Sequence, residues 1–220
     1  MLPPSLRAPL GVIAALAALT VVVLGVLYAG HSQPGGVDRW FIQPTADSVR
    51  PPWRHVALAM DFFGEPAGSA LVVAAAAAGC LLLRRPRAAV FVVAAAGLAV
   101  VTTTLLKSLV GRTIHGPDNL SYPSGHTAFL TALALAVTLL ATARPGLGGT
   151  AGTSLVLAAA LAAGAAMGWA QVALGAHYPT DVLGGWCTAL AVTPATAWLV
   201  DRTADRLGGR PADAGPREPR

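Results

Sequence analysis

Long stretches without Asp, Glu, Lys or Arg are the most regular feature of the chain. Trimmed to their apolar cores, they predict six spans near 8–29, 66–83, 88–106, 125–143, 152–172 and 181–200. Each is close to the ~20 residues that an α-helix needs to cross a bilayer. The cores are rich in Ala, Gly, Val and Leu, and small residues let membrane helices approach closely. We therefore predict an all-α polytopic membrane protein, built as a six-transmembrane-helix bundle.

The composition excludes several other classes of protein. The 220 residues are 55% hydrophobic and 11% charged, whereas soluble domains contain about 25% charged residues. A water-soluble protein, a disordered chain and a basic nucleic-acid-binding domain are excluded. Cys80 and Cys187 fall inside predicted spans, where they act as small apolar residues. The first span could instead be a cleaved signal peptide, but its apolar core of about 22 residues exceeds the usual 7–15, which favours a retained helix.

The positive charges predict how the bundle is oriented, because cytoplasmic loops collect Lys and Arg. With the N-terminus inside, the cytoplasmic face holds ten of the 15 positive residues: Arg7, Arg84, Arg85, Arg87, Arg144, Arg202, Arg206, Arg210, Arg217 and Arg220. The outer face holds five: Arg39, Arg50, Arg54, Lys107 and Arg112. We expect an integral plasma-membrane protein of a bacterial cell, with both termini cytoplasmic. The net charge of +5 then reports orientation, and no nucleic-acid partner is expected.

The remaining regions complete the expected organisation. We expect residues 1–200 to form the membrane domain. Within it, 31–65 are predicted to form an outer loop with short amphipathic helices at the membrane interface, because aromatic residues occur there among polar residues and prolines. Residues 201–220 are rich in Arg, Asp, Pro and Gly and are predicted to be a flexible cytoplasmic tail. Two polar connections remain, 107–126 and 173–181, called here the first and second polar segments. By this topology both lie on the outer side.

The first polar segment carries the features of an anion site. It contains the only lysine of the chain, Lys107, then Arg112, and ends in Pro-Ser-Gly-His at 123–126. Ser124 stands where the fourth span begins, so it is a candidate N-cap, and the free N–H groups of that helix would face outward. Such a terminus attracts anions, and Lys107 and Arg112 would add charged donors.

The second polar segment carries the features of an activated nucleophile. Asp181 follows His177 by four residues, so its carboxylate could accept the ring N–H and leave the other nitrogen free to attack. Each residue also has an ordinary structural explanation: a snorkelling Lys107, a satisfied interfacial His126 or His177, or a helix N-terminal Asp181. Their joint occurrence in two segments on one side favours a site.

This combination resembles the type 2 phosphatidic acid phosphatase superfamily, the integral membrane lipid phosphate phosphatases. The likeness lies in the upstream lysine, the Pro-Ser-Gly-His run at 123–126 and Gly-Ala-His-Tyr-Pro-Thr-Asp-Val-Leu-Gly-Gly at 175–185. It implies that His177 forms a phosphohistidine, oriented by Asp181, and that His126 protonates the leaving group and then activates water. It further implies that Lys107, Ser124 and the Gly125 N–H hold the phosphate oxygens. No metal or other cofactor is implied.

The chain departs from the family at two phosphate-binding arginines. The Arg-Pro expected seven residues after Lys107 is replaced by Ile114 and His115, and the Ser-Arg expected before His177 is replaced by Ala170 and Gln171. Loss of one preorganised donor can cost about 10²–10³ in rate. We expect Arg112 to supply part of the missing charge, with His115 and Gln171 as auxiliary donors.

Three functions follow from these patterns. The first is a phosphatase that hydrolyses the phosphate monoester or diphosphate of a membrane lipid, such as a phosphatidate-like lipid, phosphatidylglycerophosphate or a polyprenyl (di)phosphate. The second is a non-catalytic relative that binds phospholipid headgroups or acts as a partner subunit, because two arginines are absent. The third is a small transporter whose polar segments line a path. The sequence shows no inverted repeat or pair of broken helices, the features that would support a transporter. The oligomeric state is not predicted.

Overall fold

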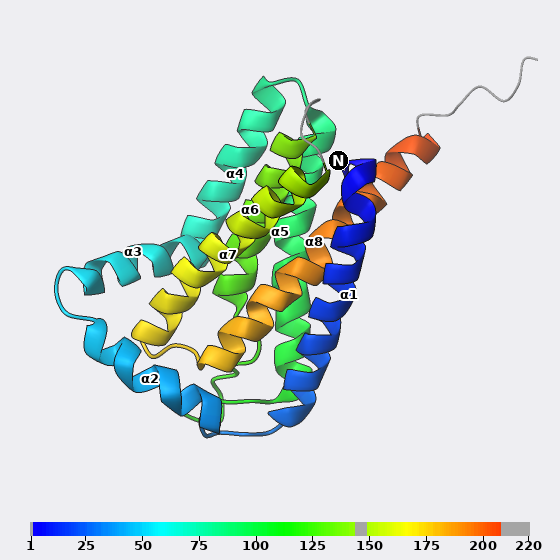
Figure 1. Cartoon of the computed structure of the whole chain (residues 1–220). Helices are drawn as coiled ribbons and strands as arrows, with labels where there is room; N and C mark the ends of the chain where they lie inside the picture. The colour runs from blue at the N-terminus through cyan, green and yellow to red at the C-terminus, as the bar shows by residue number, and fades with distance from the viewer. Residues whose placement is uncertain (1, 144–148, 208–220) are drawn as a thin grey trace, which may run out of the picture.

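The computed structural model describes residues 2–143 and 149–207, and within them the only regular elements are helices (Figure 1). In chain order they are α1 Pro4–Leu27, α2 Gly36–Ser48, α3 Trp53–Gly64, α4 Pro66–Leu82, α5 Pro86–Val110, α6 Gly125–Thr142, α7 Gly149–Ala173 and α8 Pro179–Leu207. An isolated bridge joins Thr113 to Leu120 in the loop before α6. The predicted all-α class is confirmed.

Five helices of the described residues are long and apolar enough to cross a membrane: α1, α5, α6, α7 and α8. The helix pair α3 and α4 passes the same test together, with a bend of 68° between its halves, which makes up to six. Except at the end of α8, the helix bounds lie within a few residues of the predicted spans because prolines and charged turns delimit them. Pro66, Pro86 and Pro179, for example, open α4, α5 and α8, and proline is well tolerated in a first helical turn.

The first part of the predicted flexible tail, residues 201–207, is helical. Helix α8 runs through residues 201–207 as far as Leu207, and the Asp201 carboxylate accepts a hydrogen bond from the Leu2 backbone N–H at 2.9 Å. Apart from Pro194, residues 190–207 contain no strong helix breaker, so the helix continues once the apolar residues end. Residues 208–220, the rest of that tail, lie outside the described part of the chain, as does Arg144.

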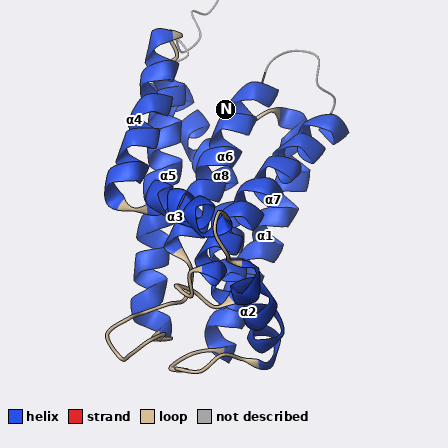
Figure 2. Cartoon of the chain, turned by 90° about the vertical axis from the view of Figure 1, so that its left-hand side faces the viewer, coloured by secondary structure: helices blue, strands red, loops and turns tan. Residues whose placement is uncertain are grey.

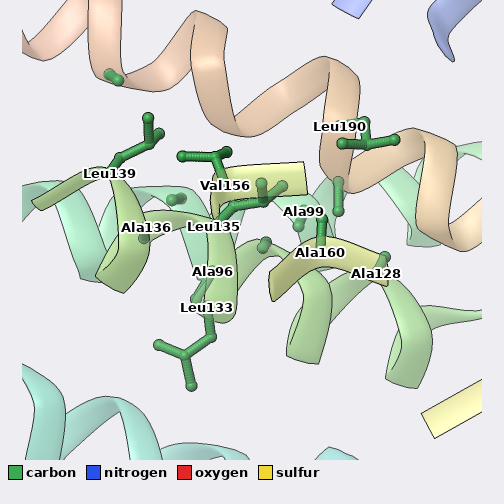
Figure 3. Close-up of a cluster of buried hydrophobic side chains, with 14 of the residues drawn as sticks. Ala96, Ala99, Ala128, Leu133, Leu135, Ala136, Leu139, Val156, Ala160 and Leu190 are labelled. Atoms are coloured by element: carbon green, nitrogen blue, oxygen red, sulfur yellow. The ribbon is translucent and has the colours of Figure 1, made fainter. Parts of the chain in front are cut away.

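Helix α6 lies at the centre of the bundle and packs against α5, α7 and α8. Figure 3 shows Leu135 and Leu139 of α6 among buried side chains that come from all four helices. Many of the buried residues are alanines, which bring the helix axes close together. At Gly185 of α8 even a Cβ atom would clash with the backbone oxygen of Ser124. The close packing of α8 on the start of α6 therefore requires a glycine there.

Both polar segments lie at one end of the bundle, opposite the N-terminus and the arginine-rich turn between α4 and α5 (Figure 1). Helix α2 covers this end, and α3 crosses the side of the bundle above it (Figure 2). The segment predicted to carry short amphipathic helices contains α2 and α3, and both helices contribute buried residues. Asp38 of α2 and Ala57 of α3 are fully buried, so this segment is part of the packed structure around the polar end.

Candidate active site

The loop before α8 places His177 next to Asp181. His177 is 8% exposed, and its Nδ1 lies 3.8 Å from Asp181 Oδ2. That oxygen accepts the Tyr178 backbone N–H at 3.0 Å. The predicted pairing of the two residues is present, at a distance longer than a hydrogen bond. Catalytic contacts are often long in a site without substrate, and the buried Nδ1 has no hydrogen-bond partner among the described residues.

Ser124 joins the two polar segments. Its backbone N–H donates to the Asp181 carbonyl at 2.9 Å, while its Oγ accepts the Thr127 N–H at 3.4 Å and so caps α6 as expected. Ser124 is fully buried, and its Oγ also lies 3.1 Å from Thr127 Oγ1. The exposed donors at this terminus are therefore the first backbone N–H groups of α6, beginning at Gly125, which have no intrahelical partner.

His126, one residue into α6, meets two carboxylates that sequence reasoning did not find. Its Nε2 lies 3.4 Å from Asp61 Oδ1 and 3.8 Å from Glu65 Oε1, both near the end of α3. His126 is 24% exposed, so its ring is open to the surroundings on one side. A Cβ at Gly64 would clash with that ring. The bend between α3 and α4 thus sets the position of His126.

The two auxiliary candidates both bond to the protein itself. Gln171, buried at the end of α7, donates from Nε2 to Asp61 Oδ1 at 2.7 Å. His115, at φ 60°, contacts the Gly175 carbonyl through Nε2 at 2.7 Å. The family's second arginine position is therefore occupied by an amide that holds Asp61. His115 instead ties the first polar segment to the second.

Arg112 does not lie where a phosphate-binding group would. It is fully buried; NH1 donates to Thr180 Oγ1 and Asp181 Oδ1, each at 2.6 Å, and NH2 donates to Asp38 Oδ2 at 2.7 Å. The rings of Tyr28 and Tyr178 lie 4.1 and 4.5 Å from the guanidinium carbon. The Nε of Arg112 has no hydrogen-bond partner among the described residues but is buried, so Arg112 presents no exposed donor to a substrate. The expectation of a phosphate-binding Arg112 is corrected accordingly.

Asp38, the partner of Arg112 from α2, is also a residue that the sequence did not single out. Its carboxylate accepts four hydrogen bonds: from the Gly35 N–H, the Thr180 N–H, the Thr180 hydroxyl and Arg112. Burial alone would raise the pKa of Asp38, but these hydrogen bonds outweigh it and hold the pKa below its usual value. Asp38 therefore stays ionised.

Lys107 is half-buried near the end of α5, the helix that leads into the first polar segment. Its ammonium group interacts electrostatically with Asp181. His126 interacts electrostatically with both Lys107 and His177. The fold thus brings together the four residues expected to carry the chemistry. Lys107 comes from α5, His126 from α6, His177 from the loop before α8, and Asp181 from the first turn of α8.

One group of side chains in the described part of the chain has the geometry to hold a metal ion. Asp61, Glu65 and His126 offer ligand atoms that lie within 4.8 Å of one another. These groups also bond to each other and to Gln171, and a half-exposed pair of carboxylates beside a histidine needs no ion to be stable.

Comparisons with known proteins show the family and the fold of the chain. The sequence profile of the PAP2 superfamily matches residues 88–205, more than half of the chain. The chain belongs to the PAP2 superfamily. The fold is similar to the crystal structure of a transmembrane PAP2-type phosphatidylglycerolphosphate phosphatase from Bacillus subtilis, with a TM-score of 0.67 at 19% identity, over 88% of this chain and 96% of that one. No curated protein matches the chain.

The PAP2 match begins at residue 88 and therefore includes only part of the candidate site. It includes α5 to α8 and so Lys107, His126, His177 and Asp181. Helices α2 and α3 precede it, so Asp38, Asp61 and Glu65 come from outside the matched residues. The signal that could have found these three is charge scarcity, because the whole chain has only ten acidic residues. Asp61 also stands between Met60 and Phe62, in an apolar stretch of the sequence.

Proposed function

We propose that this membrane protein is a lipid phosphate phosphatase, a phosphoric ester or diphosphate hydrolase that acts through a phosphohistidine. The observation that carries the proposal is the direct link between the two polar segments, from the Ser124 N–H to the Asp181 carbonyl. It fixes the start of α6, with His126, against the start of α8, beside His177. An acid–base group and a nucleophile are thereby set around one point, as phosphoryl transfer requires.

In the first chemical step, His177 attacks the phosphorus through Nε2, and the bond from phosphorus to the lipid oxygen breaks. His126 gives its proton to that oxygen, so the alcohol leaves uncharged. In the second step, His126 takes a proton from water, the oxygen of which attacks the phosphohistidine and releases inorganic phosphate and His177. Asp181 holds the Nδ1 proton of His177 and stabilises the positive charge that forms on the ring.

The phosphate oxygens are held by Lys107 and by the first N–H groups of α6 from Gly125, because developing negative charge is best met by preorganised donors. Ser124 contributes by capping this helix, since its Oγ is buried and engaged with Thr127. Arg112 contributes by holding Asp181. The reaction needs no metal in this proposal, because the positive charge comes from Lys107 and the helix terminus.

A panel assay tests this function and identifies the substrate. Purified protein in detergent is offered phosphatidate, phosphatidylglycerophosphate, and isoprenyl phosphates and diphosphates, with EDTA present. We expect phosphate release from at least one of them and none from His177→Ala, with His55→Ala on α3 as the matched control. Release that stops with EDTA and returns with a divalent cation would contradict the metal-free mechanism and implicate Asp61, Glu65 and His126.

A second function is favoured by one observation. Gln171 stands where the family resemblance predicts an arginine, and it donates a hydrogen bond to Asp61. The site therefore lacks the positive charge of that arginine and has the Asp61 carboxylate nearby. A non-catalytic relative that binds phosphorylated headgroups, or a partner subunit, would have this property. The same panel separates the two, because binding of a lipid phosphate without release would favour the second function.

We also propose that both termini are cytoplasmic and that the site faces outward. The arginine-rich α4–α5 turn lies at the end of the bundle opposite the polar segments (Figure 1), in agreement with the charge distribution. An Asp118→Cys variant tests this orientation, since Cys80 is half-buried and Cys187 buried. Labelling by an impermeant reagent on whole cells is expected, and labelling only after lysis would reverse the orientation.

A further inference from the structure

The contact between Asp38 and Arg112 crosses from α2, outside the residues of the family match, to the loop that leads into the site. Arg112 is shared between two fully buried carboxylates, with Asp38 at 2.7 Å and Asp181 at 2.6 Å. Thr180 is hydrogen-bonded to both Arg112 and Asp38. All four side chains are buried. Electrostatic interactions between them are therefore screened far less than at a surface.

The charges of this cluster determine what Asp181 can do for His177. If Arg112 paired with Asp181 alone, the pair would be neutral, and Asp181 would stabilise a positive charge on His177 only weakly. Asp38 compensates the guanidinium from its other edge, so the three groups together retain one negative charge. This negative charge can stabilise a protonated His177, because Asp181 Oδ2 lies 3.8 Å from His177 Nδ1.

We propose that Asp38 is a positioning residue that, through Arg112, keeps Asp181 oriented and negatively charged toward the nucleophile His177. The proposal rests on the proposed function for its consequence in catalysis. Asp38 itself touches neither His177 nor a reacting atom. Its hydrogen bonds are to Gly35, Thr180 and Arg112. Helix α2 thus takes part in the site through charge and geometry, not by contact with the substrate.

Other charged groups at this end of the bundle also affect the protonation of His177. They come from every element packed around this end: Tyr178 and Asp181 from the second polar segment and α8, Arg112 from the first polar segment, Lys107 from α5, His126 from α6, and Asp61 and Glu65 from α3 beside His126. None of them is altered when Asp38 is replaced by Asn. A shift in that variant therefore reports the charge of Asp38.

The test measures the reactivity of His177 without any substrate. The full-length protein in detergent is treated with diethyl pyrocarbonate across a range of pH, and modification of the His177 peptide is followed by mass spectrometry. Loss of a negative charge destabilises the protonated ring, so the pH midpoint of modification should fall in Asp38→Asn. We expect a fall of about one pH unit, the effect that Coulomb's law gives for one unit charge at ~10 Å and an effective dielectric constant of about 20. In the phosphatase assay, kcat should fall about tenfold with KM little changed.

Two further variants separate charge from structure. Asp47→Asn, on the exposed side of the same helix, should leave the midpoint and kcat unchanged. Thr180→Val disturbs the same hydrogen bonds but keeps both carboxylates and Arg112, so it should lower the melting temperature without moving the midpoint. If Asp38→Asn yields no monodisperse protein, Asp38→Ser and Asp38→Thr, which also remove the charge but keep an acceptor for Thr180, replace it.

The outcomes distinguish this inference from the proposed function. An unchanged midpoint in a folded Asp38→Asn variant overturns the role of Asp38, and an active enzyme with that result leaves the phosphatase proposal standing. A lowered midpoint in a protein that releases no phosphate from any lipid supports the link from Asp38 to His177 and overturns the phosphatase. A midpoint lowered equally by Thr180→Val would show that packing, and not charge, is responsible, and would also overturn the proposal.

Discussion

Two clusters at the polar end of the bundle combine a basic side chain with two acidic ones, and they differ in almost every other respect. In the Arg112 cluster (Arg112, Asp38, Asp181 and Thr180) all groups are buried and the ion pairs are 2.6 and 2.7 Å long. In the His126 cluster (His126, Asp61, Glu65 and Gln171) the histidine is 24% exposed and its ion-pair distances are 3.4 and 3.8 Å.

The difference shows which cluster can meet a substrate. Short, buried hydrogen bonds fix a geometry and leave no exposed donor to bind a substrate, and their removal leaves buried charges without partners. Longer contacts at an open histidine leave the ring free to exchange a proton with a bound lipid or water. Under the proposed function, we expect the Arg112 cluster to hold His177 in place and the His126 cluster to take part in proton transfer. The predictions below test this division, beginning with the largest effect.

Removal of Arg112 should damage folding more than any other single change at this end. Arg112→Met leaves Asp38 and Asp181 buried without their cation, at a cost of about 3–5 kcal/mol, or roughly 10 °C in melting temperature for a chain of this size. Arg39→Met, which alters an exposed arginine on α2, is the matched control. An unchanged melting temperature together with weaker inhibition by orthovanadate would instead return Arg112 to the phosphate site.

Displacement of His126 should reduce catalysis more than stability. In Gly64→Ala the new methyl group meets the His126 ring, and overpacking of this kind costs about 1–3 kcal/mol. A misplaced acid–base group can cost about 10² in rate, so kcat should fall by that order while the protein still folds. Gly79→Ala in α4, where a Cβ meets no neighbour, should have full activity. Equal kcat values in the two variants would argue against the contact between α3 and α6.

The smallest effect expected is on the pH dependence of stability. The pKa of Asp38 is lowered in the folded state, so its interactions stabilise the fold at pH values above its unfolded pKa of about 4. This contribution is lost as the pH falls through the folded-state value. The melting temperature of wild type should therefore exceed that of Asp38→Asn near neutral pH, and the gap should narrow in acid. A gap that stays constant would show that the charge of Asp38 does not contribute.

The sequence was sufficient for the fold and for the residues of the two motifs. Charge-free stretches locate membrane helices because the bilayer penalises a charge wherever it occurs, and the cap at Ser124 is a local pattern. The two acidic partners were not accessible in this way. Asp38 and Arg112 are 74 positions apart, and Asp61 and Gln171 are 110 apart. Their pairing depends on where α2 and α3 pack, which no local pattern specifies.

Arg112 shows that a role predicted from sequence also depends on contacts that no local pattern specifies. Its place after the only lysine made it a reasonable phosphate donor, since an arginine in an outward loop is normally free to bind an anion. That inference fails because Arg112 instead forms a buried ion pair with the Asp38 carboxylate from α2. A charged residue near a catalytic motif can therefore be assigned to substrate only when its partners are known.

The central claim is that His177 carries the phosphoryl group between the two steps. The most direct measurement combines His126→Ala with a radiolabelled aryl phosphate, whose leaving group needs no proton, so that attack by His177 proceeds while hydrolysis lacks its base. After rapid quenching, we predict an acid-labile, alkali-stable label on the His177 peptide, and none in the double variant His126→Ala/His177→Ala. Label on any other residue, or phosphate release by the double variant, would contradict the account.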